Sequence, residues 1–164
     1  MSQAMPRRIS HLDTRGRVRM VDVGDKPISA RVALARGRVF MHRETLDLLR
    51  DGRAPKGDVL TTAHLAGVLA AKRTAEIIPL AHVLPLDSVD LAFSLDTDTA
   101  SVGIEARVRT RGRTGVEMEA LTAVTVAALT LYDMLKAVDR GMVMGEFAVW
   151  EKRGGRSGVF RRRA

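Results

Sequence analysis

The chain has 164 residues, of which 46% are hydrophobic, 28% charged and 4% aromatic, and its formal net charge is +8 at pH 7. This length and balance predict one domain with a single core and exclude a disordered or fibrous protein. The absence of cysteine excludes disulfides, thiolate metal ligands and a cysteine nucleophile, and the positive charge favours an anionic partner such as a nucleic acid or a phosphorylated small molecule.

The chain begins with a polar, basic segment, residues 1–16, which we expect to be a flexible arm. It lacks the apolar stretch of a secretion signal, and no apolar run in the chain approaches the roughly 20 residues of a membrane helix. We therefore expect a cytoplasmic protein without a membrane partner. Residues 17–160 are predicted to form the domain, and residues 161–164 a basic tail.

The first half of the domain shows both strand and helix patterns. Residues 17–23 are predicted to be a short strand or a docked extended segment. Residues 28–41 alternate in the manner of a strand that turns near Gly37. Residues 42–52 predict a short helix with a glycine stop, followed by an alanine-rich helix that begins after Asp58 as N-cap and ends at Pro79.

The second half alternates apolar residues over residues 87–96 and 100–111, which predicts an antiparallel hairpin. A long apolar helix is expected over residues 114–138, and a last strand over residues 142–152. Helices separated by a hairpin, with a strand after the last helix, favour an α+β fold over a doubly wound sheet. We predict a ferredoxin-like, split βαβ antiparallel sheet packed with helices.

The long helix carries charges near both ends. Thr114 and Glu117 fit a capping box, so Glu117 is interpreted either as a helix cap or as a functional carboxylate. Glu119 and Asp133 fall on one stripe whose middle is threonine and aliphatic residues, which favours burial against another element. They lie 14 residues apart, about 21 Å along a helix, too far to serve one small-molecule pocket within a chain. If both are functional, a second subunit helps to build each site.

Other candidates have ordinary structural interpretations as well. Asp133 and Lys136 have the spacing of a weak surface ion pair. Lys56 precedes a helix start, where cations and backbone N–H groups receive anions, but a solvated turn lysine is commoner. Lys72 has the setting of a surface lysine, and His82, between apolar residues and prolines, that of a hydrogen-bonded core group. The four histidines lack H-x-x-x-H spacing, so no metal site is predicted.

Seven motifs occur in one order over about 150 residues. They are "MVDV", "KGDV", "AAKRT", "IPLAH", "TGVEMEALTAVTVAALTLYDM", "KAV" and "GGRSG". Together they closely resemble the MoaC family of molybdenum cofactor biosynthesis, the cyclic pyranopterin monophosphate synthases. The resemblance extends from His11 to Phe160.

The resemblance implies an α+β, ferredoxin-like subunit that assembles as a homohexamer of dimers, with active sites at the dimer interface. It implies a lyase that converts (8S)-3′,8-cyclo-7,8-dihydroguanosine 5′-triphosphate to cyclic pyranopterin monophosphate and releases pyrophosphate. The catalytic residues that it implies are Asp133, Lys136 and Lys56. The substrate-binding residues that it implies are Leu80, Ala81, His82, Met118, Glu119, Glu117, Lys72, Arg31 and Arg156.

Three positions depart from the family pattern. Ala81 and Leu135 stand where the family usually has cysteine, so either neither thiol takes part in the chemistry or this protein is impaired. Arg156 stands where many members have lysine, which keeps the cation but changes its geometry.

The resemblance and the charges suggest roles for these residues. Lysines and arginines would neutralise the triphosphate as pyrophosphate leaves, and two lysines beside a carboxylate suit proton transfer. We expect Lys56 and Lys136 to handle protons, with acid and base unassigned, while Asp133 orients or deprotonates. Glu117, Glu119 and His82 are expected to hold the ring system. No cofactor is expected to be required, and magnesium carried by the triphosphate is an open alternative.

Two rival functions remain at this point. A basic nucleic-acid-binding module fits the +8 charge and the "RRR" tail, although no aromatic stacking platform is present. A non-catalytic pterin or nucleotide binder fits the loss of the two cysteines. The reading as an enzyme implies a small-molecule substrate and no nucleic-acid partner.

Overall fold

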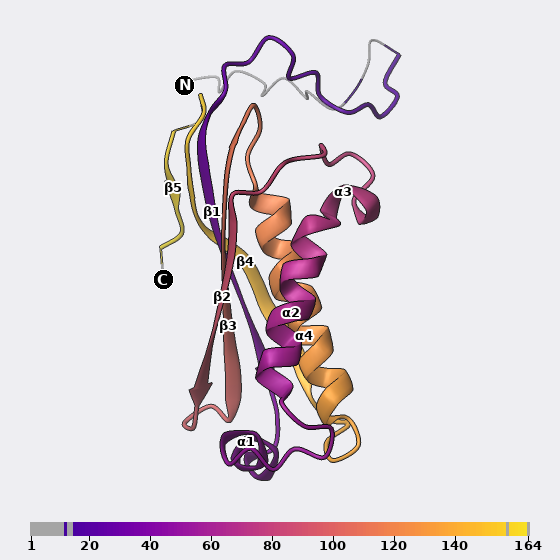
Figure 1. Cartoon of the computed structure of the whole chain (residues 1–164), viewed down its shortest axis with the longest axis vertical. Coiled ribbons are helices and arrows are strands. Elements are labelled where there is room, and N and C mark those ends of the chain that lie inside the picture. Colours follow the sequence, from indigo (N-terminus) through magenta and orange to yellow (C-terminus); the bar gives the residue numbers. More distant parts are fainter. Residues whose placement is uncertain (1–11, 13–14, 157, 164) are drawn as a thin grey trace, which may run out of the picture.

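The computed structural model describes Leu12, residues 15–156 and residues 158–163 (Figure 1). Most of the expected arm, and the last residue of the expected tail, lie outside the described residues. The described elements are β1 (Ser29–Phe40), α1 (Arg43–Arg50), α2 (Val59–Lys72), α3 (Thr74–Ile77), β2 (Ser88–Asp96), β3 (Ser101–Gly112), α4 (Glu117–Leu135), β4 (Val143–Arg153) and β5 (Phe160–Arg161).

The strands form one sheet in the order β2-β3-β1-β4-β5, and all neighbouring strands are antiparallel. Three helices lie between β1 and β2 in the chain, and α4 lies between β3 and β4. Figure 1 shows α2 and α4 side by side, packed together against the sheet. The α+β class and the antiparallel hairpin predicted from the sequence are confirmed.

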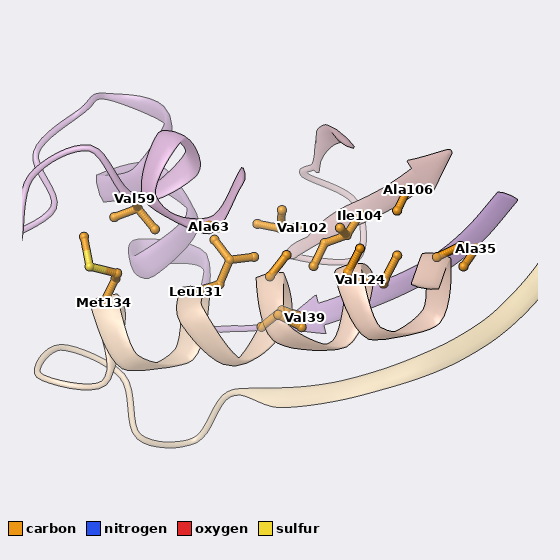
Figure 2. Close-up of a cluster of buried hydrophobic side chains, with 14 of the residues drawn as sticks. Ala35, Val39, Val59, Ala63, Val102, Ile104, Ala106, Val124, Leu131 and Met134 are labelled. Carbon is orange, nitrogen blue, oxygen red and sulfur yellow. The ribbon is translucent and has the colours of Figure 1, made fainter. Parts of the chain in front are cut away.

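The core lies between the sheet and the two long helices. Alternate residues of β1 and β3, among them Val39, Val102 and Ile104, point towards Val124 and Leu131 of α4 (Figure 2). Each of these five side chains is at most 2% exposed. Burial of each contributes about 1.5–3 kcal/mol relative to exposure, so this layer fixes α4 on the sheet.

The turn expected near Gly37 is absent, because β1 runs unbroken through this residue. A Cβ atom there would lie 2.4 Å from the ring of Phe147 and 2.7 Å from Val124. Glycine is needed at this position for the close approach of β4 and α4 to the strand. The pairing of β1 with β4 also shifts register between Arg36 and Arg38.

The predicted start of α2 is confirmed, since the Asp58 carboxylate accepts a hydrogen bond from the Thr61 N–H at 3.0 Å. The single helix expected up to Pro79 is wrong. The chain leaves helical geometry at Arg73, where φ is −107°, and then forms the short helix α3. The Thr74 hydroxyl donates to the carbonyl groups of the last turn of α2, which satisfies them at the break.

Helix α4 is the described segment that bears on the expectation that the chain has no membrane helix. Among the described residues it is the one helix whose length and composition would allow it to cross a membrane. Its apolar segment is 50% buried within the protein, against the sheet and α2. The helix therefore has the packing of a core helix.

Candidate active site

Helix α4 divides the predicted site residues into two groups. Its last turn carries Asp133, and its first turn carries Glu119, at opposite ends of 19 helical residues. The separation of about 21 Å along the axis confirms that these two carboxylates do not face one small pocket within the chain. Helix α2 runs alongside, beginning near the last turn of α4 and ending near its first turn (Figure 1).

At the last turn, two lysines hold one carboxylate. The Lys136 Nζ lies 2.7 Å from Asp133 Oδ1, and the Lys56 Nζ lies 3.2 Å from Oδ2. Lys56 also donates to the backbone carbonyl of Asp133 at 2.8 Å. We call Lys56, Asp133 and Lys136 the ion triad. The structure thus brings together the three residues for which a catalytic role was expected.

The ion triad is about half exposed, so its ion pairs contribute little to folding stability. Hydrogen bonds from Lys136 and then Lys56 hold the pKa of Asp133 below its ordinary value. The same contact raises the pKa of Lys136. The carboxylate is therefore ionised, with two proton donors in contact, at neutral pH.

The position of Lys56 follows from the loop between α1 and α2. Gly57 adopts a φ of +87°, which favours glycine, and its N–H donates to the carbonyl of Ala54. Asp58 then caps α2. Because the tight turn is joined directly to the helix cap, the backbone of Lys56 is fixed where its side chain reaches Asp133.

At the other end of α4, cations surround a cavity of about 650 Å³, which we call the basic cavity. Its lining includes Arg31 and Arg156, as expected from the sequence, and one carboxylate, Glu117. The further cations in its lining are Lys26, Arg113, Lys152 and Arg153. Ser29 also lines it, and its hydroxyl is buried without a hydrogen-bond partner in the described part of the protein.

Arg31 is held in this cavity by backbone groups. Its Nε and Nη2 atoms each donate at 3.3 Å, to the carbonyl oxygens of Gly112 and Arg113. The guanidinium lies against a glycine turn, where a Cβ on Gly155 would stand 1.7 Å from Nη1. Gly154 and Gly155 have φ values of +98° and +75°, which favour glycine. Gly154 and Gly155 of the "GGRSG" motif therefore make room for Arg31.

A second cavity, of about 320 Å³, adjoins the first and is called here the apolar cavity. Leu80, Ala81, His82, Met118 and Glu119 line it, as the sequence led us to expect of substrate-binding residues. Val21 and Val23 of the 17–23 segment also line it, so this segment is docked against the domain and is not a strand of the sheet. Lys26 and the Thr114, Gly115 and Glu117 region line both cavities.

The capping-box interpretation of Glu117 is wrong. Helix α4 begins at Glu117 itself, with Val116 in the N-cap position and no side-chain cap. The Glu117 carboxylate turns back over Gly115, where a Cβ would lie 1.9 Å from Oε2. Its Oε1 lies 3.6 Å from the Nζ of Lys152. The carboxylate consequently lines both cavities instead of capping the helix.

The surroundings of Glu119 and His82 in the apolar cavity differ: the first is buried, and the second is hydrogen-bonded to the backbone. Glu119 is 4% exposed, and burial, together with the nearby negative charge of Glu117, raises the pKa of its carboxyl. His82 Nε2 lies 2.8 Å from the carbonyl oxygen of Val21. Because a carbonyl only accepts, Nε2 carries the proton and Nδ1 is left for another partner. His82 is thus hydrogen-bonded and also faces the cavity.

Lys72 is the one predicted site residue that, in the described chain, belongs to neither cavity and is not part of the ion triad. It is the last residue of α2, is exposed, and does not line either cavity. Sequence reasoning in turn missed Ser29 and four basic residues, Lys26, Arg113, Lys152 and Arg153. The basic residues beside the matched motifs, in "DKP", "RTRGRTG" and "EKRGG", are the signal that could have identified these four.

The stripe expected to be buried along α4 is only partly so. Thr122 is 8% exposed, but Leu129 is 54% exposed. On α2, Leu65 and Leu69 are 59% and 55% exposed. The helical layer of a single chain therefore presents aliphatic side chains to solvent between the two ends of α4.

Comparison with known proteins gives one consistent family. The sequence model of the MoaC family matches residues 20–155. A protein from Thermomicrobium roseum named cyclic pyranopterin monophosphate synthase is 61% identical over 94% of this chain and 93% of its own length. Proteins of the same name from Chloroflexus aurantiacus and Pelotomaculum thermopropionicum are each 57% identical over 94% of this chain, covering 94% and 91% of their own lengths. The chain belongs to the MoaC family.

Proposed function

We propose that this protein is a cyclic pyranopterin monophosphate synthase. The substrate is (8S)-3′,8-cyclo-7,8-dihydroguanosine 5′-triphosphate, and the products are cyclic pyranopterin monophosphate and pyrophosphate. Membership of the family and the shared name of its relatives support the reaction. The observation in the molecule that carries the proposal is the ion triad, in which Lys56 and Lys136 both contact the Asp133 carboxylate.

The basic cavity suits the triphosphate. It has six cations and one carboxylate in its lining, and Arg31 presents a guanidinium that the backbone has already oriented. Charge-assisted hydrogen bonds of this kind are strong and geometrically specific for phosphate oxygens. They also stabilise the negative charge that develops as pyrophosphate leaves. We assign the cavity to phosphate binding and leaving-group stabilisation.

The apolar cavity suits the ring system of the substrate. Leu80 and Met118 offer apolar contact, and Glu119 and His82 offer polar groups at a few fixed points, which is the usual composition of a small-molecule site. The raised pKa of Glu119 brings its carboxyl closer to the range where it exchanges a proton with a bound ring.

The ion triad suits proton transfer. The ionised Asp133 carboxylate holds two protonated lysines in place, so either lysine can donate a proton to the substrate while the other still balances the carboxylate. Its distance from both cavities means that the triad of one subunit does not act on a substrate bound at the other end of the same α4.

We infer that two subunits combine their opposite ends into one site. The exposed leucines of α2 and α4 form a surface that a second copy of the chain would cover, and such a contact would lie between the two ends. The strand order β2-β3-β1-β4, with helices between β1 and β2 and between β3 and β4, supports the ferredoxin-like subunit that we propose, and a homohexamer of dimers is the proposed assembly. Lys72, at the end of α2, would reach substrate only in that assembly.

We propose that the enzyme has no resident cofactor or metal and that magnesium arrives with the triphosphate. We also propose a cytoplasmic location. Among the described residues, no group of three or more histidines or carboxylates is arranged to hold a metal ion. The phosphate charges are met by lysine and arginine, so the geometry does not need a protein-bound metal for that purpose.

The test supplies the cyclised nucleotide to protein made in a host that lacks its own synthase. We expect release of one pyrophosphate for each cyclic pyranopterin monophosphate formed. Asp133→Ala, prepared in the same way, controls for contaminating activity. Binding of the substrate by wild-type protein without product would leave a non-catalytic binder and overturn the proposal.

A further inference from the structure

Asp139 is a buried carboxylate in the turn that follows α4. Its side chain has no exposure to solvent. It accepts hydrogen bonds from the N–H of His42 at 2.8 Å, the N–H of Gly141 at 2.9 Å and the hydroxyl of Thr45 at 3.2 Å. Burial raises the pKa of Asp139, but these hydrogen bonds outweigh it and hold the pKa below its ordinary value. The group is a fixed anion.

This carboxylate joins two distant segments of the chain. His42 occupies the N-cap position of α1, but its side chain makes no cap hydrogen bond. Asp139 instead brings a negative charge to this helix start from 97 residues away. Its own N–H donates to the carbonyl of Leu135 at 3.0 Å, the last residue of α4. The start of α1 is thereby fixed to the end of α4.

The same two segments carry the ion triad. Asp133 and Lys136 lie at the end of α4, and Lys56 lies in the loop that leads from α1 to α2. The start of that loop is tied to α1 by a hydrogen bond from the Arg53 N–H to the Leu48 carbonyl at 2.9 Å. A shift of α1 relative to α4 therefore moves Lys56 away from its partner.

Resting on the proposed function, we infer that Asp139 is a positioning residue of the catalytic centre. It sets the distance between Lys56 and Asp133 by clamping α1 to the end of α4, without touching the substrate.

Asp139→Asn tests this role. Oδ2 of Asp139 accepts from His42 and Thr45, and Oδ1 accepts from Gly141, whereas an uncharged amide can accept on one of these two sides only, so the clamp is weakened. We expect kcat to fall about tenfold while KM changes less than about twofold, because the cavities lie at the far end of α4. As Lys56 withdraws, Asp133 loses one of the two cations that lower its pKa, so the acid limb of kcat moves to higher pH.

Three matched variants separate positioning from stability. His42→Ala removes an imidazole that is 74% exposed but keeps the backbone N–H, and should retain wild-type kcat. Val108→Ala, in the core of β3, lowers Tm without touching the clamp and should also keep kcat. Thr45→Val removes one of three hydrogen bonds and should lower kcat about two- to threefold, and it remains informative if Asp139→Asn fails to fold.

A readout without substrate separates this inference from the proposed reaction. The pKa of Asp133, measured by carboxyl ¹³C NMR with Asp133→Asn to assign the signal, should rise in Asp139→Asn and stay unchanged in His42→Ala. A rise in a protein without turnover would reject the reaction and keep the positioning role. An unchanged Asp133 pKa and unchanged kcat, with Tm lowered, would reject the positioning role.

Discussion

The two ends of α4 use charge in opposite ways. At the last turn, one carboxylate is balanced by two lysines in direct contact, and all three side chains are about half exposed. At the first turn, six cations surround a cavity, while the nearby Glu119 carboxyl is buried with a raised pKa. A balanced cluster at contact distance suits proton transfer, whereas an excess of positive charge around a cavity suits anion binding. On the proposed function, one helix therefore carries the proton-transfer triad at its last turn and the anion-binding cavity at its first.

The largest effect should come from the chemical end. Asp133→Ala removes the group that both lysines contact, so we expect kcat to fall about 10³-fold with substrate affinity changed less than about threefold. Steady-state kinetics and equilibrium binding of the substrate measure the two quantities. A comparable loss in both would show that the two ends are not functionally separate.

Substitutions at the first turn of α4, the proposed binding end, should change KM more than kcat. Arg31→Ala removes a cation that two backbone carbonyls orient, and we expect KM to rise about 30-fold with a smaller change in kcat. Arg31→Lys should recover only part of the loss, because one ammonium cannot replace the planar donor array. If Arg31→Ala lowered kcat alone, the basic cavity would not be the phosphate site.

A glycine pair sharpens the comparison within the binding end. Gly155→Ala places a methyl group where the Arg31 guanidinium lies, and we expect KM to rise about tenfold. Gly158→Ala is the matched control, because Gly158 also has a positive φ, +63°, but no heavy atom within 4 Å of the added Cβ. Equal KM values for both variants would mean that backbone strain, and not displacement of Arg31, is responsible.

The smallest effect concerns stability. Glu119 is an acid whose folded pKa is raised above its ordinary value of 4.5, so folding becomes less favourable as pH rises above that value and the carboxyl must ionise while buried. Glu119→Gln should raise Tm at pH 7 by about 2–4 °C and should have no such effect at pH 4. Thermal unfolding at both pH values checks this, and a lower Tm at pH 7 would contradict it.

Much of the fold follows from local patterns. The alternation in β2 and β3 and the Asp58 cap are visible in sequence because they depend on near neighbours. Gly37 was misinterpreted because the ring that needs its space belongs to Phe147, on another strand. The Glu117 cap failed because Gly115 leaves room for the carboxylate to turn into the cavities, where Lys152 of β4 lies 3.6 Å away.

The site was predictable in part. The spacing of Asp133 and Lys136 shows that they can pair, but only the fold shows that Lys56 joins them from another segment. The family resemblance supplied many of the candidate binding residues that line the two cavities. It did not supply the Ser29 hydroxyl or the clamp by Asp139, because both depend on burial created by contacts between distant strands and helices.

The most direct measurement is complementation between the two ends. Lys56 and Asp133 contact each other within one chain, so the informative mixture combines Asp133→Ala subunits with Arg31→Ala subunits. If each site takes its ion triad from one subunit and its basic cavity from a two-fold-related partner, an equal mixture after subunit exchange, assayed with substrate well below the wild-type KM, should recover about a quarter of the wild-type rate. A mixture with proven exchange and no recovery would show that the two ends do not meet across subunits.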